Sequence, residues 1–472
     1  MLGFFALFFI EKLCYFILRM KISDFKNKRV TVMGLGIVGG GVGVVKFLVK
    51  ARAKVLITDL KTKKQLESSF KKIMRLPVKL VLKKHRPQDF INTDLVIRNP
   101  GVPDDSSYLK IASKNNVPIE TDVGIFFELC PTPIIGVTGT KGKSTVVTLI
   151  HQFLKSKYPD VILAGNIGTS PLESLKRITK KNKVVLELSS WQLEGLKKHK
   201  MSPQVALITN IYPEHLNRYK SLSAYINAKK IIFLFQKRDD NLFLNYDDKI
   251  VRRFSKKANS KVYFFSEKKI PKDLKKIIEG LKIRGEHNIS NVLAAISVAN
   301  LYKVPFKNIR RVLGKFRWLP GREEFIAEIN GVKYFNDTTA TMPDAAIFAI
   351  KTLSREFPRA KIILIAGGQD KNLEYKELAK EIKKNVRYLI LFSGNASAKI
   401  KKGIRDLKIS RKTFSIFPNI NSMERAVKLA SQLAGRGDIV LLSPAAASFN
   451  LFKNEFDRGE QFNKFVKKLK KN

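Results

Sequence analysis

Residues 136–145 read GVTGTKGKST, and this stretch decides which fold the centre of the chain is expected to have. The apolar run at 134–138 predicts a strand, and the residues from Lys143 onward can open a helix. Glycines on such a turn let backbone N–H groups surround phosphates, while Lys143 can neutralise phosphate oxygens and Ser144 can bind Mg²⁺. A phosphate-binding loop usually has Gly where this chain has Val137, so the motif is a shortened form. It favours ATP binding over a purely structural turn.

The pattern on either side of this loop alternates short β-branched runs with amphipathic stretches, which is typical of parallel α/β units. Turn residues at 131–133 and 319–321 interrupt it. We therefore expect an α/β protein whose three domains cover residues 21–130, 131–318 and 319–472. The expected strands are residues 30–33, 55–58, 95–97, 134–138, 184–188, 205–209, 362–366, 388–392 and 438–442.

Residues 1–20, MLGFFALFFIEKLCYFILRM, form an apolar extension before the first domain. Glu11 and Lys12 interrupt the run, whereas a membrane-spanning helix needs about 20 apolar residues. The extension also lacks the basic start and cleavage site of a signal peptide. Three interpretations stay open: an interfacial anchor, a weak membrane span, or a start codon assigned too early, with Met20 as the natural beginning. We expect a cytoplasmic protein with no obligatory membrane span, and peripheral membrane association through residues 1–20 is the alternative.

The 472-residue chain carries 89 Lys and Arg against 40 Asp and Glu, a net charge of +49. Such a charge suits nucleic acid, an acidic membrane surface or anionic substrates. The excess recurs along the whole chain, however, which favours solvated faces over a docking stripe, and we expect no nucleic-acid partner. An apolar content of 44% excludes a wholly disordered chain. Two cysteines exclude a disulfide framework and a cysteine-based zinc cluster, and indicate a reducing compartment.

A second glycine-rich turn, GLGIVG at residues 34–39, follows the expected strand 30–33. Asp59 lies 20 residues beyond Gly39, at the end of the next strand. Such glycines allow a diphosphate to approach a helix N-terminus, and the acid can accept from a pair of hydroxyls. The motif predicts a dinucleotide-type site but does not say which diphosphate binds.

Two further segments follow expected strands. Glu187 opens ELSSWQLE, about forty residues after the phosphate loop, where a carboxylate can hold a metal near the γ-phosphate. His215 lies beside Glu214 in NIYPEHLNRY and can be a metal ligand or an acid/base. Taken singly, each also fits a solvated or capping residue.

Together these segments resemble the Mur ligases, ATP-dependent amide-forming enzymes of peptidoglycan precursor synthesis, from about Asn27 to the C-terminus. GTKGKST and HNISNVLAA are shared with the wider Mur and folylpolyglutamate ligases. Several blocks are closer to the D-glutamate-adding branch of the family: ELSSWQLE (187–194), LPGR (319–322), NDTTAT (336–341), GGQDK (367–371), LSPAAAS (442–448), FKN (452–454) and RG (458–459). The chain departs from the usual family pattern at Glu214 and Asn217, where Asp is common.

The resemblance implies a Rossmann-like N-terminal domain that holds the uridine diphosphate end of a sugar precursor, a central P-loop ATPase-like domain with a parallel sheet, and a Rossmann-like C-terminal domain. The implied substrates are UDP-N-acetylmuramoyl-L-alanine and D-glutamate. ATP would activate the carboxylate as an acyl phosphate, which the amine attacks, giving ADP and phosphate. Two Mg²⁺ ions and a monomeric enzyme are implied as well.

The resemblance also assigns site residues, of which Lys143, His215 and Lys229 would be catalytic. The implied ATP-binding residues are Gly139, Thr140, Lys141, Gly142, Lys143, Ser144, Thr145, Asn291, Arg322 and Asp337. The implied UDP-substrate residues are Gly36, Ile37, Val38, Asp59, Lys61, Gly101, Asn166, Ser189 and Gln192. D-Glutamate would be bound by Thr341, Lys371, Ser448 and Phe456. The implied metal ligands are Ser144, Glu187, His215 and Lys229, the last as a carbamate.

Three alternatives remain. One is a Mur-type ligase that adds a different amino acid. Another is an NAD-dependent oxidoreductase, which residues 34–39 and Asp59 suggest but which leaves GTKGKST unexplained. The third is a basic ATPase stimulated by nucleic acid, which would bind DNA in a salt-sensitive way.

Overall fold

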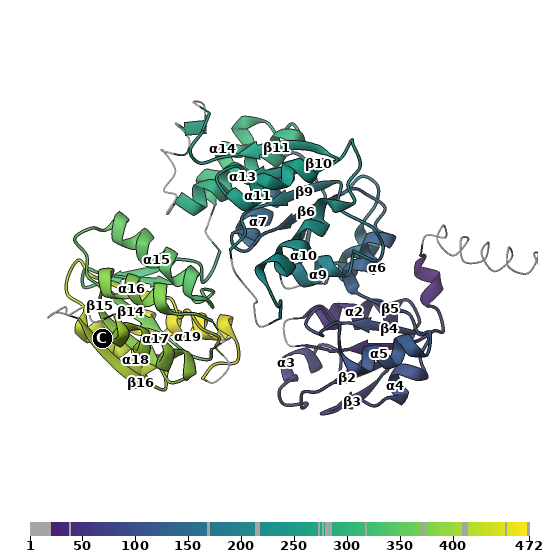
Figure 1. The fold of residues 1–472 in the computed structure, drawn as a ribbon, viewed down its shortest axis with the longest axis horizontal. Helices are drawn as coiled ribbons and strands as arrows, with labels where there is room; N and C mark the ends of the chain where they lie inside the picture. Colours follow the sequence, from purple (N-terminus) through teal and green to yellow (C-terminus); the bar gives the residue numbers. More distant parts are fainter. Residues whose placement is uncertain are drawn as a thin grey trace, which may run out of the picture. The chain divides into compact units, whose positions relative to one another are not determined.

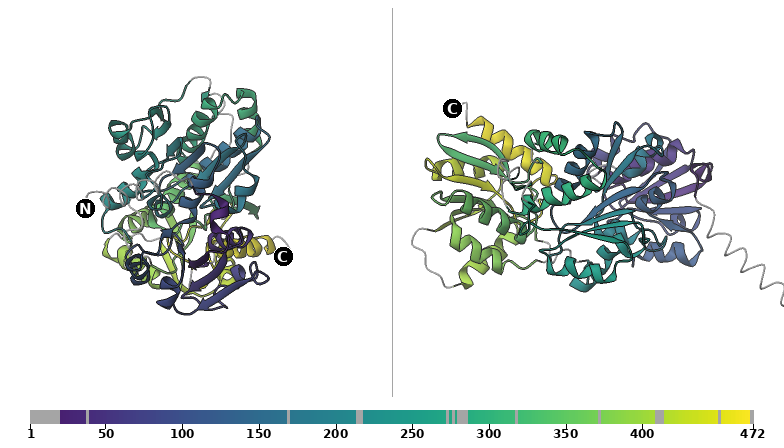
Figure 2. Two further views of the ribbon diagram at one scale, coloured as in Figure 1. Left: turned by 90° about the vertical axis from the view of Figure 1, so that its right-hand side faces the viewer. Right: turned by 90° about the horizontal axis from the view of Figure 1, so that it is seen from above.

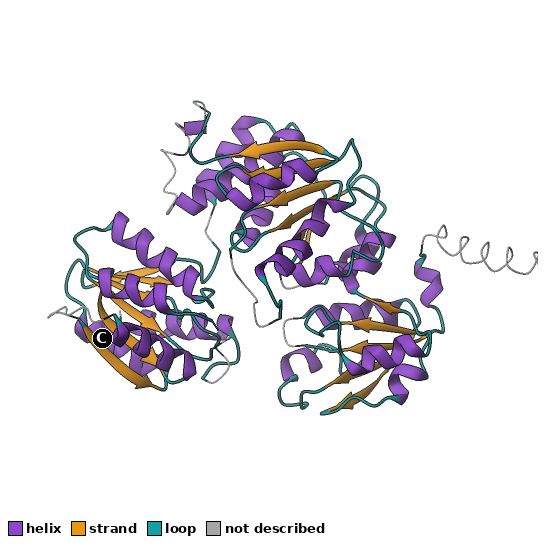
Figure 3. Cartoon of the chain, in the orientation of Figure 1, coloured by secondary structure: helices purple, strands orange, loops and turns teal. Residues whose placement is uncertain are grey.

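The computed structural model describes residues 20–36, 39–167, 170–212, 218–271, 274–275, 278, 286–316, 319–370, 373–407, 414–448 and 451–469. These residues form three β-sheets flanked by helices, which confirms the expected three-part α/β class (Figures 1 and 3). The chain divides into two compact units, residues 1–281 with 289–314 and residues 282–288 with 315–472. The first unit contains two of the sheets and the second unit contains the third.

The first sheet is parallel and has the strand order β3-β2-β1-β4-β5. Because β1 lies between β2 and β4, the strand order reverses beside it, and ligands of open α/β sheets bind at such a point. The strands are β1 (Arg29–Met33), β2 (Lys54–Asp59), β3 (Val78–Leu82), β4 (Leu95–Arg98) and β5 (Ile119–Glu120). The helices around it are η1 (Ile22–Phe25), α2 (Gly40–Lys50), α3 (Glu67–Phe70), α4 (Gln88–Ile91) and α5 (Ser107–Lys114).

The second sheet is also parallel, with the order β11-β10-β9-β6-β8-β7. Its central strand β6 is buried throughout, as its continuous apolar sequence predicts. The strands are β6 (Ile134–Thr138), β7 (Val161–Gly165), β8 (Lys183–Glu187), β9 (Val205–Ile208), β10 (Asn241–Asn245) and β11 (Lys261–Phe265). The helical elements are α6 (Asp122–Leu129), α7 (Lys143–Lys155), α8 (Pro171–Ser174), η2 (Leu175–Arg177), α9 (Ser190–Glu194), α10 (Leu222–Leu234), α11 (Lys249–Arg252), η3 (Arg253–Lys257), α13 (Glu286–Leu301) and α14 (Phe306–Lys315).

The third sheet is mixed and has the order β12-β13-β17-β14-β15-β16. Only β12 runs antiparallel to its neighbour, because Asn330 and Gly331 form a two-residue turn with positive φ angles of 52° and 77°. Separate apolar clusters cover the two faces of this sheet, and helices lie on both (Figures 1 and 2). The strands are β12 (Glu324–Ile329), β13 (Val332–Asn336), β14 (Ile362–Ala366), β15 (Val386–Phe392), β16 (Ser415–Ile420) and β17 (Ile439–Leu442). The helices are α15 (Pro343–Glu356), α16 (Lys376–Asn385), α17 (Asn395–Asp406), α18 (Met423–Leu433) and α19 (Glu455–Lys468).

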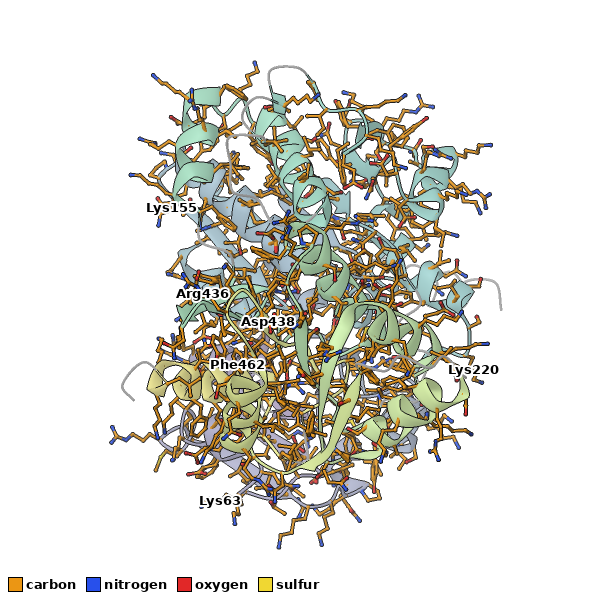
Figure 4. The ribbon with its side chains drawn as sticks, turned by 90° about the vertical axis from the view of Figure 1, so that its left-hand side faces the viewer. Lys63, Lys155, Lys220, Arg436, Asp438 and Phe462 are labelled. Atoms are coloured by element: carbon orange, nitrogen blue, oxygen red, sulfur yellow. The ribbon has the colours of Figure 1, made fainter. Side chains whose placement is uncertain are left out.

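The apolar extension expected at residues 1–20 lies outside the described residues, apart from Met20. Within the described ranges, we find no helix with the length and apolar character needed to cross a bilayer. Exposed lysines from separate parts of the chain, such as Lys63, Lys155 and Lys220, point outward (Figure 4). This supports the interpretation of the positive charge as solvated faces.

Asp122 is the first residue of α6, the helix that follows β5 and precedes β6 in the chain. Its carboxylate is buried. Its Oδ1 accepts a hydrogen bond from the Val123 backbone N–H (2.8 Å), and its Oδ2 accepts one from the Ser170 hydroxyl (3.3 Å). Burial raises the pKa of Asp122 from 3.8 to about 6, because these two donors do not replace the lost hydration. The folded first unit therefore binds this proton more tightly than the unfolded chain does.

The Asp122→Asn variant is expected to lose a pH dependence of stability. The contribution of the Asp122 carboxyl to stability is fully present below its unfolded pKa and is lost as the pH rises through the folded pKa of about 6. The free energy of unfolding of the wild type should fall by about 2 kcal/mol relative to that of the variant between pH 4 and pH 7. Chemical denaturation of both proteins across this range measures the difference, and parallel pH curves would contradict the assignment.

Candidate active site

The phosphate loop lies between the end of β6 and the first residue of α7, as the sequence predicts. Neighbouring residues at the end of β9 hold its backbone. The N–H of Thr140 donates to the Asn210 carbonyl (2.9 Å), and the N–H of Lys141 donates to the Asn210 side-chain oxygen (2.8 Å). The Thr209 hydroxyl donates to the Lys141 carbonyl (2.6 Å). These contacts fix the loop on the second sheet before any ligand binds.

Two glycines give this loop its shape. Gly139 and Gly142 have φ angles of +148° and +82°, which other residues rarely adopt. A Cβ at Gly142 would lie 2.1 Å from Asn291 Oδ1, so α13 packs directly against the loop. Asn291, assigned to the nucleotide by resemblance, is thus brought to the phosphate loop from about 150 residues away.

Lys143 folds back over the loop that precedes it. Its ammonium donates to the carbonyls of Gly139 and Thr140, both at 2.9 Å. The positive charge therefore lies against the backbone that would surround phosphates, and it is positioned by α7, whose first residue it is.

Glu187 occupies the last position of β8, where it pairs in register with Val137 of β6. Its side chain is 2% exposed, and its Oε1 accepts a hydrogen bond from Asn166 Nδ2 (2.9 Å). Its Oε2 is buried without a hydrogen-bond partner in the described protein. A buried carboxylate oxygen left in this way is costly unless a cation or another donor binds it.

Lys229 reaches the same end of β6 from α10. It is 1% exposed, and its Nζ donates to the Gly139 carbonyl (2.8 Å) and contacts Thr138 Oγ1 (3.4 Å). Its Nζ also lies 4.7 Å from the centre of the Tyr225 ring. A lysine so deeply buried beside the phosphate loop is unlike the exposed lysines elsewhere on the chain.

The hydroxyl of Ser144 and the carboxylate of Glu187 are the hard oxygen donors that Mg²⁺ prefers. Together with the orphaned Glu187 oxygen, this donor set fits a magnesium ion beside the phosphate loop. In the part of the chain that is described, no three His, Cys, Asp or Glu side chains converge into a metal cluster. His215, the other expected ligand, lies outside the described residues.

The second glycine turn is held by Asp59, which is buried at the end of β2. Asp59 Oδ2 accepts from the N–H groups of Leu35 (2.9 Å) and Gly36 (3.2 Å), and Oδ1 accepts from the Lys61 N–H (2.9 Å). The carboxylate thus organises the turn itself, in addition to any hydroxyl pair it could bind. Ile37 and Val38 lie outside the described residues.

The loop after β4 meets this turn. Asn99 Nδ2 donates to the Gly34 carbonyl (3.4 Å), and Asn99 Oδ1 accepts from the Gly101 N–H (3.1 Å). Gly101 and Gly36, both expected at the UDP substrate, therefore belong to adjoining loops at the point where the strand order reverses.

Ser189 and Gln192 form a reciprocal cap at the start of α9. The Ser189 hydroxyl accepts from the Gln192 N–H (3.2 Å), and Gln192 Oε1 accepts from the Ser189 N–H (3.0 Å). These two predicted substrate residues thus also have a structural role, since they begin the helix that follows Glu187.

In the second unit, Asp337 follows β13 and joins two neighbouring loops. Its Oδ2 accepts from the Ser443 hydroxyl (2.8 Å), and its Oδ1 accepts from the Glu323 N–H (3.3 Å), next to Arg322. Asp337 and Arg322, both expected at the nucleotide, thus lie at the same end of the third sheet.

The residues expected to bind D-glutamate belong to this unit. Ser448 is buried, and its hydroxyl has no hydrogen-bond partner among the described residues. Phe456 is 54% exposed in the first turn of α19, so it is not a core aromatic. Thr341 precedes α15, in the loop that begins at Asp337. Lys371 lies outside the described residues.

Asp370, the residue before Lys371, is firmly held. Its Oδ2 pairs with Lys399 Nζ (2.7 Å), and its Oδ1 accepts from the Tyr375 hydroxyl (3.2 Å). Burial opposes ionisation, but the Lys399 hydrogen bond and charge outweigh it and lower the pKa of Asp370. A fixed carboxylate thus anchors the start of the Lys371 segment.

Arg458 is a site-supporting residue that the sequence did not single out. It is 0% exposed, and its guanidinium donates to the Thr338 carbonyl (2.7 Å), the Thr338 hydroxyl (3.1 Å) and the Ala446 carbonyl (3.1 Å). It joins the loop after Asp337 to the loop before Ser448. Its only sequence signal is its place in the RG block at 458–459.

Family models cover most of the chain. Residues 28–121 match a Mur ligase MurD-like N-terminal domain, residues 137–299 match a Mur ligase middle domain, and residues 321–446 match a Mur ligase glutamate ligase domain.

Curated relatives match over nearly their whole length. The chain is 40% identical over 466 residues to the UDP-N-acetylmuramoylalanine–D-glutamate ligase of Roseiflexus sp. (strain RS-1), covering 93% of this chain and 98% of that protein. It is 38% identical over 467 residues to the ligase of the same name from Borreliella burgdorferi (strain ZS7), covering 95% and 100%.

Solved structures share the fold. The UDP-N-acetylmuramate-alanine ligase MurC of Thermotoga maritima aligns with a TM-score of 0.63 at 18% identity, covering 94% of this chain and 100% of that one. The MurF ligase of Thermotoga maritima in complex with ADP aligns with a TM-score of 0.58 at 17% identity, covering 95% and 100%.

Gly142→Ala is expected to weaken nucleotide binding at least tenfold, since the added Cβ would collide with Asn291 Oδ1 and the positive φ disfavours any L-residue. Calorimetric titration with ADP measures the affinity. Gly314→Ala is the matched control, because a Cβ at Gly314 in α14 meets nothing within 4 Å. Wild-type ADP affinity in Gly142→Ala would contradict the role given to the loop.

Proposed function

The chain belongs to the Mur ligase family, and from this premise we propose that it joins D-glutamate to UDP-N-acetylmuramoyl-L-alanine. It is an ATP-dependent ligase that forms an amide bond in peptidoglycan precursor synthesis. The choice of D-glutamate is supported by full-length relatives at 40% and 38% identity that carry this activity in their names.

The observation that carries the chemical part of the proposal is the buried Glu187 oxygen without a partner beside the phosphate loop. Two anions, a carboxylate and a triphosphate, must approach each other in the first step, and this requires concentrated positive charge. Lys143 at the loop supplies one such charge. A magnesium ion held by Ser144 and Glu187 would supply the rest by neutralising phosphate oxygens.

The proposed reaction has two steps, transfer of the γ-phosphoryl group to the substrate carboxylate and attack of the amine on the acyl phosphate. The substrate carboxylate oxygen attacks the γ-phosphorus of ATP, the bond to the β-γ bridging oxygen breaks, and ADP leaves. The amine nitrogen of D-glutamate, having lost a proton, attacks the carbonyl carbon of the acyl phosphate, and phosphate leaves. The loop backbone and Lys143 orient the transferred phosphoryl group throughout.

The UDP end of the substrate would bind at the reversal point of the first sheet, where the Gly36 turn adjoins the Gly101 loop. Its diphosphate would face the N-terminus of α2, and Asp59 keeps that turn in shape. D-Glutamate would bind in the second unit, where the buried Ser448 hydroxyl offers a donor for a carboxylate and Lys371 would offer a charge.

Lys229 would act as a carbamate. The ammonium would first release a proton to solvent, and the neutral amine would then form an N–C bond to CO₂ and release a second proton, which gives an anionic carbamate with oxygen ligands. The contact of Lys229 with the Gly139 carbonyl at the phosphate loop supports this role. We propose a monomer, as the resemblance to the Mur ligases implies. ATP and the UDP-linked precursor are intracellular compounds, and we therefore place the enzyme in the cytoplasm.

Phosphate release by the purified protein should require ATP, UDP-N-acetylmuramoyl-L-alanine and D-glutamate together. Lys143→Ala should lower kcat/KM at least 100-fold, because the charge at the transferred phosphoryl group is lost. The control is Lys155→Ala, an exposed lysine at the other end of the same helix (Figure 4). Faster phosphate release with L-alanine, L-lysine or diaminopimelate than with D-glutamate would reassign the amino-acid substrate.

The carbamate predicts a spectroscopic signal that does not depend on turnover. In ¹³C-bicarbonate the wild type should show a carbamate carbon resonance by NMR, and Lys229→Arg should lose it because a guanidinium does not form a stable carbamate. Lys230→Arg, the adjacent position on α10, should keep the resonance. Absence of the signal from the wild type, or its persistence in Lys229→Arg, would contradict the carbamate.

A further inference from the structure

Arg218 contacts two separate structural elements of the first unit, the loop after β4 and helix α9. Its side chain is 15% exposed and lies just beyond the segment that contains His215. One guanidinium N–H donates to the Pro100 carbonyl (3.0 Å), and another donates to Glu194 Oε2 (3.2 Å). Its central carbon lies 4.7 Å from the centre of the Trp191 ring. The guanidinium is therefore held by hydrogen bonds in its plane and by the Trp191 ring against its face.

The partners of Arg218 belong to a loop that follows a strand of the first sheet and to a helix that follows a strand of the second sheet. Pro100 belongs to the loop after β4 and directly precedes Gly101, which is expected to contact the UDP substrate. Trp191 and Glu194 lie on α9, which begins one turn after the proposed magnesium ligand Glu187. Arg218 thus links the loop expected to hold the sugar nucleotide to the segment that adjoins the metal site.

The charges around Glu194 are consistent with Arg218 linking the two segments. Burial raises the pKa of Glu194, and the nearby Asp104 raises it further, while Arg218 opposes both effects. Asp104 is itself paired with Arg98 at 2.7 Å, and both side chains are close enough to Glu194 to affect its pKa. Without Arg218, Glu194 would be left partly buried without its main cationic partner.

Lysine would not replace the arginine here. A guanidinium offers two N–H groups in one plane and stacks on an indole, whereas an ammonium is a compact charge without a flat face. Only the guanidinium can satisfy the Pro100 carbonyl and the Glu194 carboxylate while covering the Trp191 ring.

The next residue continues the connection toward the phosphate loop. Tyr219 is buried, and its ring centre lies 5.4 Å from that of Tyr225. The hydroxyls of Tyr225 and Thr140 are hydrogen-bonded at 3.1 Å, and Thr140 belongs to the phosphate loop. A series of contacts therefore runs from the Pro100 carbonyl through Arg218 and, by way of its chain neighbour Tyr219, to Tyr225 and Thr140.

We propose that Arg218 is a positioning residue that sets the UDP-substrate loop in register with the phosphate loop, so that the substrate carboxylate meets the γ-phosphate. This inference rests on the proposed function, because it takes the Gly101 loop to hold the sugar nucleotide. Arg218 acts through Pro100 and α9, and it need not touch either substrate.

Another ion pair in the first unit provides a control. Lys46 of α2 and Glu173 of α8 are paired at 3.0 Å, with side chains 33% and 36% exposed. This pair joins two helices and touches neither loop. Removing the Lys46–Glu173 ion pair should therefore show whether weakening the contact between α2 and α8 by itself changes ligand affinity.

The test compares Arg218→Gln, Arg218→Lys and Lys46→Gln with the wild type. Arg218→Gln should raise both the Kd and the KM for UDP-N-acetylmuramoyl-L-alanine at least tenfold, while the Kd for ADP changes less than threefold. Arg218→Lys should lie between, with at least a threefold rise, because it keeps the charge but loses the stack and one of the two hydrogen bonds. Lys46→Gln should stay within twofold of the wild type for both ligands. Calorimetry gives the Kd values, and circular dichroism and thermal melting establish that each variant is folded.

The outcomes separate this inference from the proposed function. If the wild type neither binds nor turns over UDP-N-acetylmuramoyl-L-alanine, the proposed function fails, and the inference fails with it. If the wild type binds it and the folded Arg218 variants bind it within twofold, only the inference is overturned. An equal loss of affinity for both ligands also overturns it, because that indicates a general loss of structure. If Arg218→Gln is unfolded, Arg218→Lys alone decides on the same criteria.

Discussion

The backbone conformation of residues 139–142 is the constraint on which the rest of the catalytic arrangement depends. Two glycines with positive φ angles turn the chain sharply from β6 into α7. Thr209 and Asn210 bind the loop from the end of β9, and Asn291 packs against Gly142 from α13. The loop is therefore shaped by the protein before a nucleotide arrives, and this lowers the ordering cost that a flexible loop would add to binding. Lys143 directly follows this loop, Lys229 donates to its Gly139 carbonyl, and Glu187 pairs with Val137 of the strand before it.

Buried charged side chains recur near the carboxyl ends of the strands, and most of them have specific hydrogen-bond partners. Asp59 accepts backbone N–H groups of the turn it supports, and Arg458 donates to carbonyls of two loops. Burying a charge is costly unless such contacts replace its hydration. Glu187 is the exception, because one of its oxygens has no partner among the described residues. The exception falls where phosphoryl chemistry needs a cation, and this is the physical reason for proposing a magnesium ion there.

Local patterns in the sequence predicted nine of the described strands and the two glycine turns. They missed the parallel strands β3, β5, β7, β10, β11 and β16, and they did not predict the contacts between distant segments. The expected strand 362–366 coincides with β14, and 184–188 is displaced from β8 by one residue. The antiparallel hairpin of β12 and β13 was missed, although Asn330-Gly331 is a strong turn signal, because its strands carry mixed polar residues. A different reason explains why the sequence did not point to Arg218 and Arg458 as functional residues. Each arginine has an acceptor about 120 residues away in the chain, Pro100 for Arg218 and Thr338 for Arg458, and no periodicity or spacing records such a pairing.

The proposed substrate-binding residues are divided between the two units, and this division suggests how the amino-acid specificity of this fold can change. The first unit contains both glycine turns, Glu187, Lys229 and Arg218, which we propose act on the sugar nucleotide and the phosphoryl groups. The second unit contains Ser448, Phe456 and Thr341, which we propose bind the incoming amino acid, and Arg458 donates hydrogen bonds to two loops of this unit. Activation of the carboxylate as an acyl phosphate is the same step whichever amine follows. A change of amino-acid specificity can therefore arise within the second unit while the loop geometry of the first stays intact. The positions of the sequence blocks agree with this proposed division, because most of those that resemble the D-glutamate-adding branch fall after residue 318.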